Sequence, residues 1–267
     1  MRDISVVLIG HGSSVDRFAA RSIRAAATAI RNKKLFSEVR VGLWKGRPPL
    51  KEAVVRARGP IVLLLPWLFS EGWFARRAIP AALGLRARAT PRCGRLLLYA
   101  DPVGTHPDMD RAILRCAALA LRPARGRPPP RRKTELLLVG HGTRRDPRSA
   151  GAVRAAAVRL RRRRQWAEVL PAFLDQAPSV RQALRTVRAP HAVVVPFLAD
   201  DGPHARRDLP RAMGLLRCGR RSRKPFRAEG RPAIWCARAV GSGPWMLPIV
   251  LKRVRETLRR FRIKTRR

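Results

Sequence analysis

Residues 7–13 read VLIGHGS, and residues 137–143, 130 positions later, read LLVGHGT. Two further stretches repeat at the same offset: VLLLPWL at 62–68 with AVVVPFL at 192–198, and GWFARRAIP at 72–80 with GPHARRDLP at 202–210. One offset shared by three blocks indicates an internal duplication. The period is too long for a solenoid, so the sequence predicts two related domains.

The length of the chain agrees with a duplication, because 267 residues can form two cores of about 120 to 130 residues each. We expect an N-terminal lobe over 1–122 and a C-terminal lobe over 134–267, with a basic tail from 262. The segment between them, 123–133, reads PARGRPPPRRK. Its proline and arginine content is typical of a stiff, solvated linker.

Short β-branched apolar runs alternate with amphipathic stretches in both halves. In the first half we expect strands over 4–9, 39–43, 61–65 and 96–100, and helices over 19–30, 50–56, 75–84 and 109–121. In the second half we expect strands over 135–139, 168–173, 192–195 and 233–237, and helices over 149–164, 180–187, 204–215 and 246–261. This alternation predicts an α/β fold of two tandem pseudo-symmetric lobes, each with a mostly parallel four-stranded sheet flanked by helices.

The chain is strongly basic, with 59 Lys and Arg against 17 Asp and Glu and a formal net charge of +42. Most of the excess is arginine. A GC-rich coding bias, which favours Arg, Ala and Pro together, is one explanation. The functional explanation is attraction to a polyanion such as nucleic acid, an acidic membrane surface or a polycarboxylate substrate.

Cysteine spacing and hydropathy indicate the compartment. The four cysteines form no Cys-x-x-Cys pair and no zinc spacing, which is typical of a reducing compartment. The longest apolar run, 61–69, contains a proline and is far shorter than a bilayer span. The N-terminus enters a strand pattern without a signal-peptide layout. We expect a cytoplasmic protein without a membrane span, as a monomer or a weak dimer.

Histidines follow the first predicted strand of each half, His11 in one and His141 in the other, each between two glycines. Ligands gather at the carboxyl ends of the strands in a parallel sheet. In the second half Asp175 follows the second strand and His204 follows the third. We therefore expect His141, Asp175 and His204 to converge at one sheet edge.

Two imidazoles and a carboxylate suit a borderline divalent ion such as Co²⁺, Ni²⁺, Fe²⁺ or Zn²⁺. The same groups can accept protons from a substrate nitrogen. The first half has Lys45 and Phe74 at the positions of Asp175 and His204. The sequence thus predicts one polar site, in the second half, and a degenerate counterpart in the first.

A set of motifs carries a family resemblance. They are Gly-His-Gly-[Ser/Thr] after a buried strand, FLD at 173–175 followed by PS at 178–179, PFLADDGPH at 196–204 followed by DLP at 208–210, and PVGTHP at 102–107. Together they resemble the CbiX/SirB family of class II chelatases, in its long two-domain form. Members insert cobalt or iron into sirohydrochlorin. The resemblance covers both halves of the chain.

The resemblance implies a cleft between two pseudo-symmetric lobes and gives residues their roles. His141 and His204 would bind the metal and act in catalysis. Asp175, where the family commonly has Glu, would neutralise the metal or accept pyrrole protons. His11 alone matches in the first half and would contact substrate. Some long-form members use the N-terminal pair instead, so the choice of the second half rests on this sequence.

Arginines beside the site motifs are predicted to bind substrate carboxylates, because guanidinium groups form bidentate pairs with them. The candidates are Arg144, Arg145, Arg206 and Arg207, with Arg76 and Arg77 in the first half. Ordinary helix surface is the alternative for Arg206 and Arg207.

The resemblance implies a lyase that works without ATP in cobalamin or sirohaem biosynthesis. It would have no permanently bound cofactor and would take Co²⁺, Fe²⁺ or Ni²⁺ as a substrate beside a sirohydrochlorin-type tetrapyrrole. A non-catalytic tetrapyrrole or metal-binding protein is the first alternative, because one half lacks the ligand set. A nucleic-acid-associated protein is the second. The sequence has no zinc finger, RNP-type aromatic pattern or helix-turn-helix, so we expect no specific nucleic-acid partner.

Overall fold

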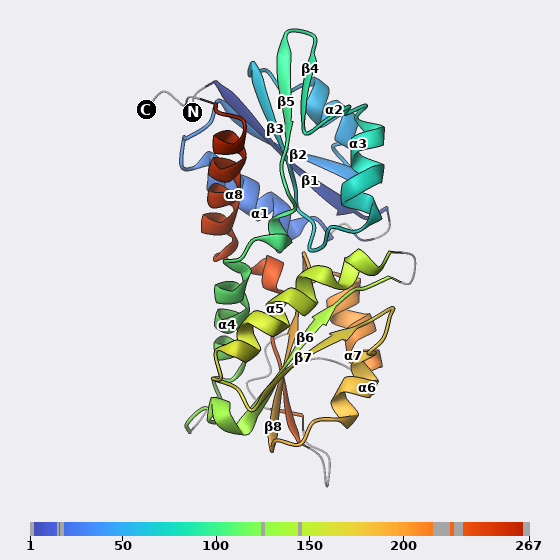
Figure 1. The fold of residues 1–267 in the computed structure, drawn as a ribbon, viewed down its shortest axis with the longest axis vertical. Coiled ribbons are helices and arrows are strands. Elements are labelled where there is room, and N and C mark those ends of the chain that lie inside the picture. The colour runs from blue at the N-terminus through green and yellow to red at the C-terminus, as the bar shows by residue number, and fades with distance from the viewer. Residues whose placement is uncertain are drawn as a thin grey trace. The chain divides into compact units, whose positions relative to one another are not determined.

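The computed structural model describes residues 3–14, 16, 19–123, 126–143, 146–215, 225–226 and 232–263. Contacts divide the chain into two compact units. Unit 1 comprises Met1–His106 and Pro244–Arg267, and unit 2 comprises Pro107–Gly243. Each unit is an α/β layer structure with one sheet (Figure 1). The α/β fold predicted from the alternating pattern is confirmed.

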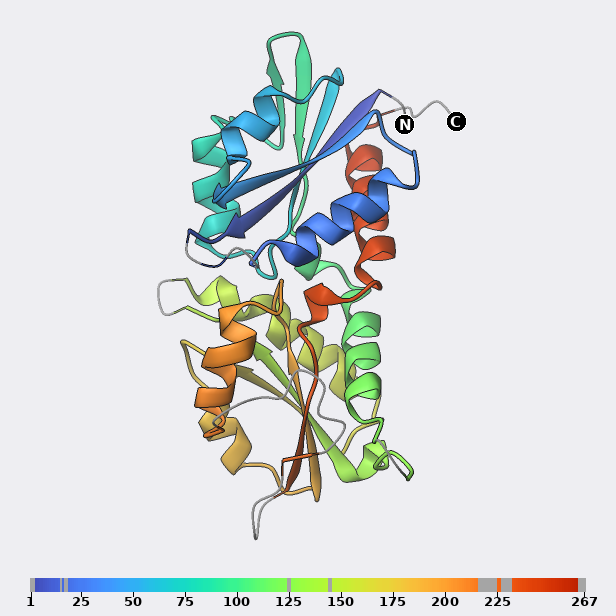
Figure 2. The ribbon, with the colours of Figure 1, turned by 180° about the vertical axis from the view of Figure 1, so that it is seen from behind.

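The sheet of unit 1 has the strand order β2-β1-β3-β5-β4, and only the β4–β5 pair is antiparallel. Its strands are β1 (Ile4–Gly12), β2 (Glu38–Lys45), β3 (Ile61–Pro66), β4 (Ala89–Arg92) and β5 (Arg95–Tyr99). Its helices are α1 (Arg21–Arg31), α2 (Leu50–Val55), α3 (Ile79–Ala82) and α8 (Met246–Arg260). Helices α2 and α3 pack on one face of the sheet, while α1 and α8 lie together on the other (Figures 1 and 2).

The sheet of unit 2 has the order β7-β6-β8-β9, with all four strands parallel. Its strands are β6 (Thr134–Gly140), β7 (Glu168–Phe173), β8 (His191–Pro196) and β9 (Ala233–Cys236). Its helices are α4 (Met109–Ala120), α5 (Gly151–Arg162), α6 (Val180–Arg185) and α7 (Leu209–Ala212).

The central strands explain why the chain folds this way. In both β1 and β6 the run of seven residues up to the glycine before the histidine is buried, which is the pattern of a parallel strand covered on both faces. Beyond each run a glycine, Gly12 or Gly142, takes a positive φ of 65° or 70°. A Cβ at Gly12 would lie 1.8 Å from the carbonyl oxygen of Lys45, so the strand end requires glycine there.

Strand β4 was not predicted from the sequence. Its residues, Ala-Thr-Pro-Arg, lack an apolar alternation, and the strand lies at the edge of the sheet. Proline is tolerated at an edge because one side of the strand needs no hydrogen-bond donors. Unit 1 therefore has five strands instead of the four expected. In unit 2, Phe226 forms an isolated antiparallel bridge with Ile234.

The two compact units differ from the lobes expected at 1–122 and 134–267. Helix α4, from the first sequence half, packs on α5 and β8 in unit 2, and α8, from the second half, packs on α1 in unit 1. The segment 123–133, expected as an interdomain linker, thus lies within unit 2. Of the predicted basic tail, 264–267 lies outside the described residues.

Buried polar side chains connect these helices to their units. In unit 2, Asp110 of α4 is 3% exposed and accepts two hydrogen bonds from Arg159 of α5, at 2.9 and 2.7 Å. In unit 1, His106 contacts Glu256 of α8, with Nε2 3.0 Å from a carboxylate oxygen. Arg253 of α8, 7% exposed, donates to the hydroxyl of Thr105 at 3.2 Å. Buried charges need such partners, so each pair fixes the position of its helix.

No helix within the described ranges is long and apolar enough to cross a membrane.

Candidate functional site

His141 lies at the carboxyl end of β6, in the turn that Gly142 makes possible. Its Nδ1 is 2.8 Å from the carbonyl oxygen of Gly142 and 3.3 Å from a carboxylate oxygen of Asp175. The backbone N–H of Asp175 donates to the carbonyl of His141 at 3.0 Å, which ties the end of β7 to the end of β6. The side chains of His141 and Asp175 are 43% and 59% exposed, so both are accessible to a ligand.

His204 begins a π-helical turn, His204–Asp208, that leads directly into α7. Its Nδ1 lies 2.8 Å from a carboxylate oxygen of Asp208, at the other end of the turn. Arg207 donates to the second oxygen of the same carboxylate at 3.2 Å. π-Helical turns are rare and occur frequently at functional sites.

The carboxylate of Asp208 stays ionised because of its surroundings. Partial burial by itself would raise the pKa of Asp208, but the hydrogen bonds from His204 and Arg207 and their positive charges outweigh it. The net effect holds the pKa of Asp208 below its ordinary value. An ionised carboxylate accepts hydrogen bonds from N–H groups and has no proton of its own to donate.

The imidazole rings of His141 and His204 are in contact. The ring centroids of His141 and His204 are 4.3 Å apart, with an interplanar angle of 84°. Each Nδ1 faces an oxygen that only accepts, the carbonyl of Gly142 or the carboxylate of Asp208, so in the neutral ring Nδ1 carries the proton. The lone pair is then on Nε2 of both rings. Metal-binding histidines characteristically donate their other ring N–H to a carbonyl or carboxylate in this way.

Asp175 joins the pair through its contact with His141. The sequence predicted three converging groups, and His141 does contact both His204 and Asp175. However, the carboxylate of Asp175 faces Nδ1 of His141, the nitrogen that bears the proton. Within the described ranges, no three or more His, Cys, Asp or Glu side chains form a group arranged to hold a metal ion. The site thus offers two imidazole nitrogens, and Asp175 orients one of them.

The predicted carboxylate-binding arginines have different environments. Arg207 is exposed and pairs with Asp208. Arg206 is half-buried, and its Nε is buried without a hydrogen-bond partner among the described residues. Arg144 and Arg145 lie outside the described residues.

The matching edge of unit 1 keeps the backbone and changes the side chains. His11 repeats the contact of His141, with Nδ1 3.0 Å from the carbonyl oxygen of Gly12. The π-helical turn recurs as Phe74–Ala78. Phe74 takes the place of His204, and its ring centroid lies 5.1 Å from that of His11 and 4.9 Å from that of Trp44. Unit 1 therefore pairs its histidine with aromatic rings.

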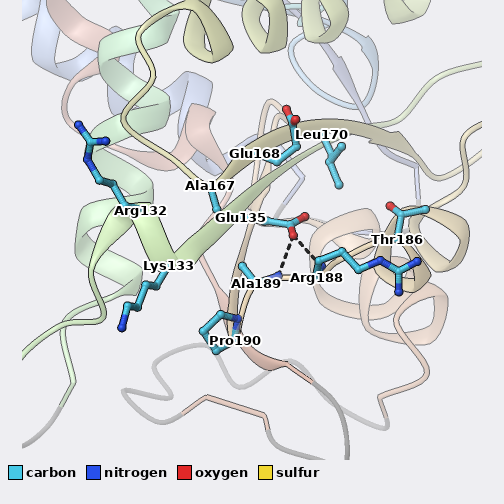
Figure 3. A pocket seen from close by; sticks show the side chains of 10 residues that line it. All are labelled: Arg132, Lys133, Glu135, Ala167, Glu168, Leu170, Thr186, Arg188, Ala189 and Pro190. Carbon is cyan, nitrogen blue, oxygen red and sulfur yellow. Dashed lines mark hydrogen bonds between the residues drawn. The ribbon is translucent and has the colours of Figure 1, made fainter.

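A hollow in unit 2 lies at the amino ends of β6 and β8, at the other end of the strands from His141 (Figure 3). It measures about 530 Å³. The carboxylate of Glu135 accepts the backbone N–H groups of Arg188 and Ala189, at 2.7 and 2.9 Å. These bonds hold the turn before β8, so Glu135 has a structural role.

Sequence reasoning did not assign Asp208. Its signal was present, because it follows His204 by four residues in a segment expected to be helical, where such residues lie on the same face. The π-helical geometry of the turn had no signal in the pattern.

Comparisons with known proteins identify relatives of the whole chain. The family model for CbiX matches residues 5–118 and, a second time, residues 135–257. A protein of Halobacterium salinarum with the name “Probable sirohydrochlorin cobaltochelatase” is 29% identical over 266 residues, covering 93% of this chain and 90% of that protein.

Solved structures share the fold. A multi-domain protein from Deinococcus radiodurans, described as structurally similar to chelatases, superposes with a TM-score of 0.79 at 28% identity. The match covers 95% of this chain and only 55% of that longer protein. SirB from Bacillus subtilis, solved with Fe³⁺, gives a TM-score of 0.71 at 20% identity, with 96% of each chain covered.

Proposed function

The chain belongs to the CbiX family, and from this premise we propose that it is a sirohydrochlorin chelatase that inserts a divalent metal ion without ATP. The supporting observation is the imidazole pair of unit 2, with ring centroids 4.3 Å apart and both Nδ1 atoms held by oxygen acceptors. The sequence similarity to the Halobacterium protein supports the choice of sirohydrochlorin as substrate.

The metal ion is the first substrate. Co²⁺, Fe²⁺ or Ni²⁺ binds to Nε2 of His141 and Nε2 of His204, since imidazole suits each of these ions. Two protein ligands leave the other positions of the ion to water. A loosely held, partly hydrated ion is easily transferred to the nitrogens of a macrocycle, whereas a closed four-ligand site would retain it.

Insertion exchanges one divalent ion for two pyrrole N–H protons, so the site must also remove protons. The carboxylate of Asp175 is exposed and lies 3.3 Å from Nδ1 of His141, and it accepts one proton and passes it to water. An imidazole that has released the metal has a free Nε2 and accepts the other. Asp208 remains ionised beside His204 and stabilises that ring while it carries the extra proton.

The charge of the chain suits the organic substrate. Sirohydrochlorin bears many carboxylates around a flat ring, and a protein of net charge +42 attracts such an anion. We assign carboxylate binding to Arg206 and Arg207, which lie in the π-helical turn that begins at His204. Arg144 and Arg145 keep this role as a prediction from the sequence. Three further predictions from the sequence also stay predictions: a place in cobalamin or sirohaem biosynthesis, a cytoplasmic location, and a monomer or weak dimer.

The test is anaerobic spectrophotometry of sirohydrochlorin with Co²⁺, Fe²⁺ or Ni²⁺, with and without the protein. Wild type should accelerate loss of the metal-free spectrum, and His141→Ala and His204→Ala should abolish the acceleration. His11→Ala, which removes the equivalent ring of unit 1, should retain insertion, with any loss confined to KM for sirohydrochlorin. Full activity in both unit 2 variants would reject this site.

The aromatic replacement in unit 1 favours one second candidate, a non-catalytic binder of tetrapyrrole or metal. The same experiment separates the two functions. A binder takes up sirohydrochlorin at equilibrium and leaves the insertion rate unchanged.

A further inference from the structure

Aromatic side chains gather at the carboxyl edge of the unit 1 sheet. The rings of His11 and Trp44 both contact Phe74. We call these three residues, together with the chain neighbour Trp73, the aromatic patch. Phe74 is its centre, in tilted contact with His11 and in edge contact with Trp44, at centroid distances of 5.1 and 4.9 Å. Trp73 precedes Phe74 in the chain at the start of the π-helical turn.

The patch occupies the position of the imidazole pair in the duplicate. With the 130-residue offset, Phe74 matches His204, and Trp44 matches Leu174. The contact of the histidine Nδ1 with the following glycine carbonyl and the π-helical turn recur in both units. Unit 1 thus has the same turns as unit 2, with an aromatic side chain where unit 2 has an imidazole.

Core packing does not explain the whole patch. Phe74 is partly buried against the core of unit 1. In contrast, Trp44 is 38% exposed and Trp73 is 60% exposed. An exposed cluster of large apolar rings costs free energy in water and commonly marks a binding surface.

The charge beside the patch is also inverted. Lys45, next to Trp44, occupies the position that Asp175 holds in unit 2. It is exposed and has no acidic partner among the described residues. An ammonium group repels a divalent cation and attracts a carboxylate. The patch is therefore unsuited to a metal ion and suited to a ring that bears acidic groups.

We propose that the aromatic patch binds the flat face of the metal-free tetrapyrrole, with Lys45 pairing to a peripheral carboxylate. The proposal rests on the proposed function for the identity of the ring. It gives the carboxyl edge of unit 1 a role of its own, which is to bind the organic substrate.

Aromatic rings with basic neighbours also bind unpaired nucleic-acid bases. The patch fits a compact ring better, because its contacts converge on Phe74 instead of following an extended groove. A single-stranded oligonucleotide is therefore the competing ligand in the test.

The test measures equilibrium binding of metal-free sirohydrochlorin by anaerobic absorbance titration, and then the KM and kcat of Co²⁺ insertion. Trp44→Ala and Trp73→Ala should each raise the dissociation constant about three- to tenfold. The double variant should raise it at least about tenfold. In the same variants KM for sirohydrochlorin should rise and kcat should stay unchanged. Lys45→Gln should weaken binding at low salt and have little effect at high salt.

Two variants at position 74 separate stacking from general apolarity. Phe74→Leu keeps apolar volume and loses the ring, so binding should weaken; Phe74→His keeps a ring, so binding should hold. Val55→Ala is the control, because it removes exposed apolar atoms from α2 of the same unit. Circular dichroism and the thermal midpoint show that each variant is folded.

Each result has one meaning. Insertion by wild type with unchanged sirohydrochlorin binding in the double variant overturns the patch and leaves the proposed function intact. Patch-dependent binding without insertion supports the patch and rejects the chelatase. Weaker binding of an oligonucleotide in the double variant, with sirohydrochlorin binding unchanged, also overturns the proposal.

Discussion

Asp208 fixes which nitrogen of His204 is free for a metal ion, because its carboxylate lies 2.8 Å from Nδ1. The substitution Asp208→Ala removes that acceptor. The π-helical turn does not require an aspartate at this position, since Ala78 occupies the same place in unit 1 and the turn forms there as well. We therefore expect the variant to fold and to leave His204 able to rotate and change tautomer.

The size of the effect follows from the contact and its exposure. A hydrogen bond to a charged group contributes about 1.5–3 kcal/mol net. The side chains of His204 and Asp208 are 53% and 32% exposed, so water screens the contact and the lower value applies. That corresponds to about a tenfold loss. Removing the hydrogen-bond partner of a metal-binding histidine lowers metal affinity or activity about 10- to 100-fold. The tenfold loss expected here lies at the lower end of that range.

Two readouts measure this loss. Equilibrium titration with Co²⁺ gives metal affinity, and anaerobic insertion kinetics give kcat/KM; both should fall about tenfold while KM for the tetrapyrrole holds. Asp208→Asn keeps an acceptor oxygen and should lose less. Glu52→Ala is the matched control, because it removes an acidic side chain from another i,i+4 contact, with Arg56. Metal affinity and kcat/KM of Asp208→Ala both within about twofold of wild type would refute the positioning role.

Three more predictions concern stability and the duplication. Asp110→Ala should lower the free energy of unfolding by about 1–3 kcal/mol. The substitution removes a carboxylate that is 3% exposed, together with the two hydrogen bonds that Arg159 donates to it. Urea unfolding measures the loss, and an unchanged midpoint contradicts it. Burial raises the pKa of Asp101, but Arg260 and Arg88 outweigh it and the pKa is lowered. A carboxyl with a lowered folded pKa stabilises above its unfolded pKa of about 3.9 and loses this as pH falls through the folded value. Thermal midpoints should therefore fall on acidification below about pH 4, more in wild type than in Asp101→Asn, and parallel curves would exclude this group. The triple substitution Lys45→Asp, Phe74→His and Ala78→Asp gives unit 1 the polar set of unit 2, so the Co²⁺ stoichiometry should double in an equilibrium titration; unchanged stoichiometry would show that backbone and side-chain identity do not suffice.

The sequence predicted the layers of the fold and the meeting of His141 with His204, and both for the same reason. Strands buried on two faces are continuous apolar runs, and their order in a parallel sheet brings the residues after each strand to one edge. Strand β4 escaped prediction because an edge strand needs no apolar alternation. The packing of α4 and α8 depends on buried pairs such as Asp110 with Arg159, which link residues far apart in sequence.

Details within the site depended on geometry that a one-dimensional pattern does not contain. Asp175 was expected beside the metal or as an acceptor of pyrrole protons, and its position in the sequence does not say that its carboxylate faces Nδ1 of His141. Asp208 was visible in the motif, but its role depends on the π-helical turn that brings it to His204. The neighbouring acceptor decides which nitrogen of an imidazole carries the proton. That acceptor is brought to the ring by the folded structure, so the sequence pattern does not reveal it.

The two halves changed unequally because different constraints act on their parts. The strands and the glycine turns are constrained by packing, since a Cβ at Gly12 would meet a backbone oxygen at 1.8 Å. The side chains at the carboxyl edge project beyond the core, so the fold survives when Phe74 stands in place of His204 or Lys45 in place of Asp175. One copy of the edge is enough to bind one metal ion. The edge of unit 1 has an aromatic ring and an ammonium group at those positions, and its exposed tryptophans form the surface that we propose for the ring.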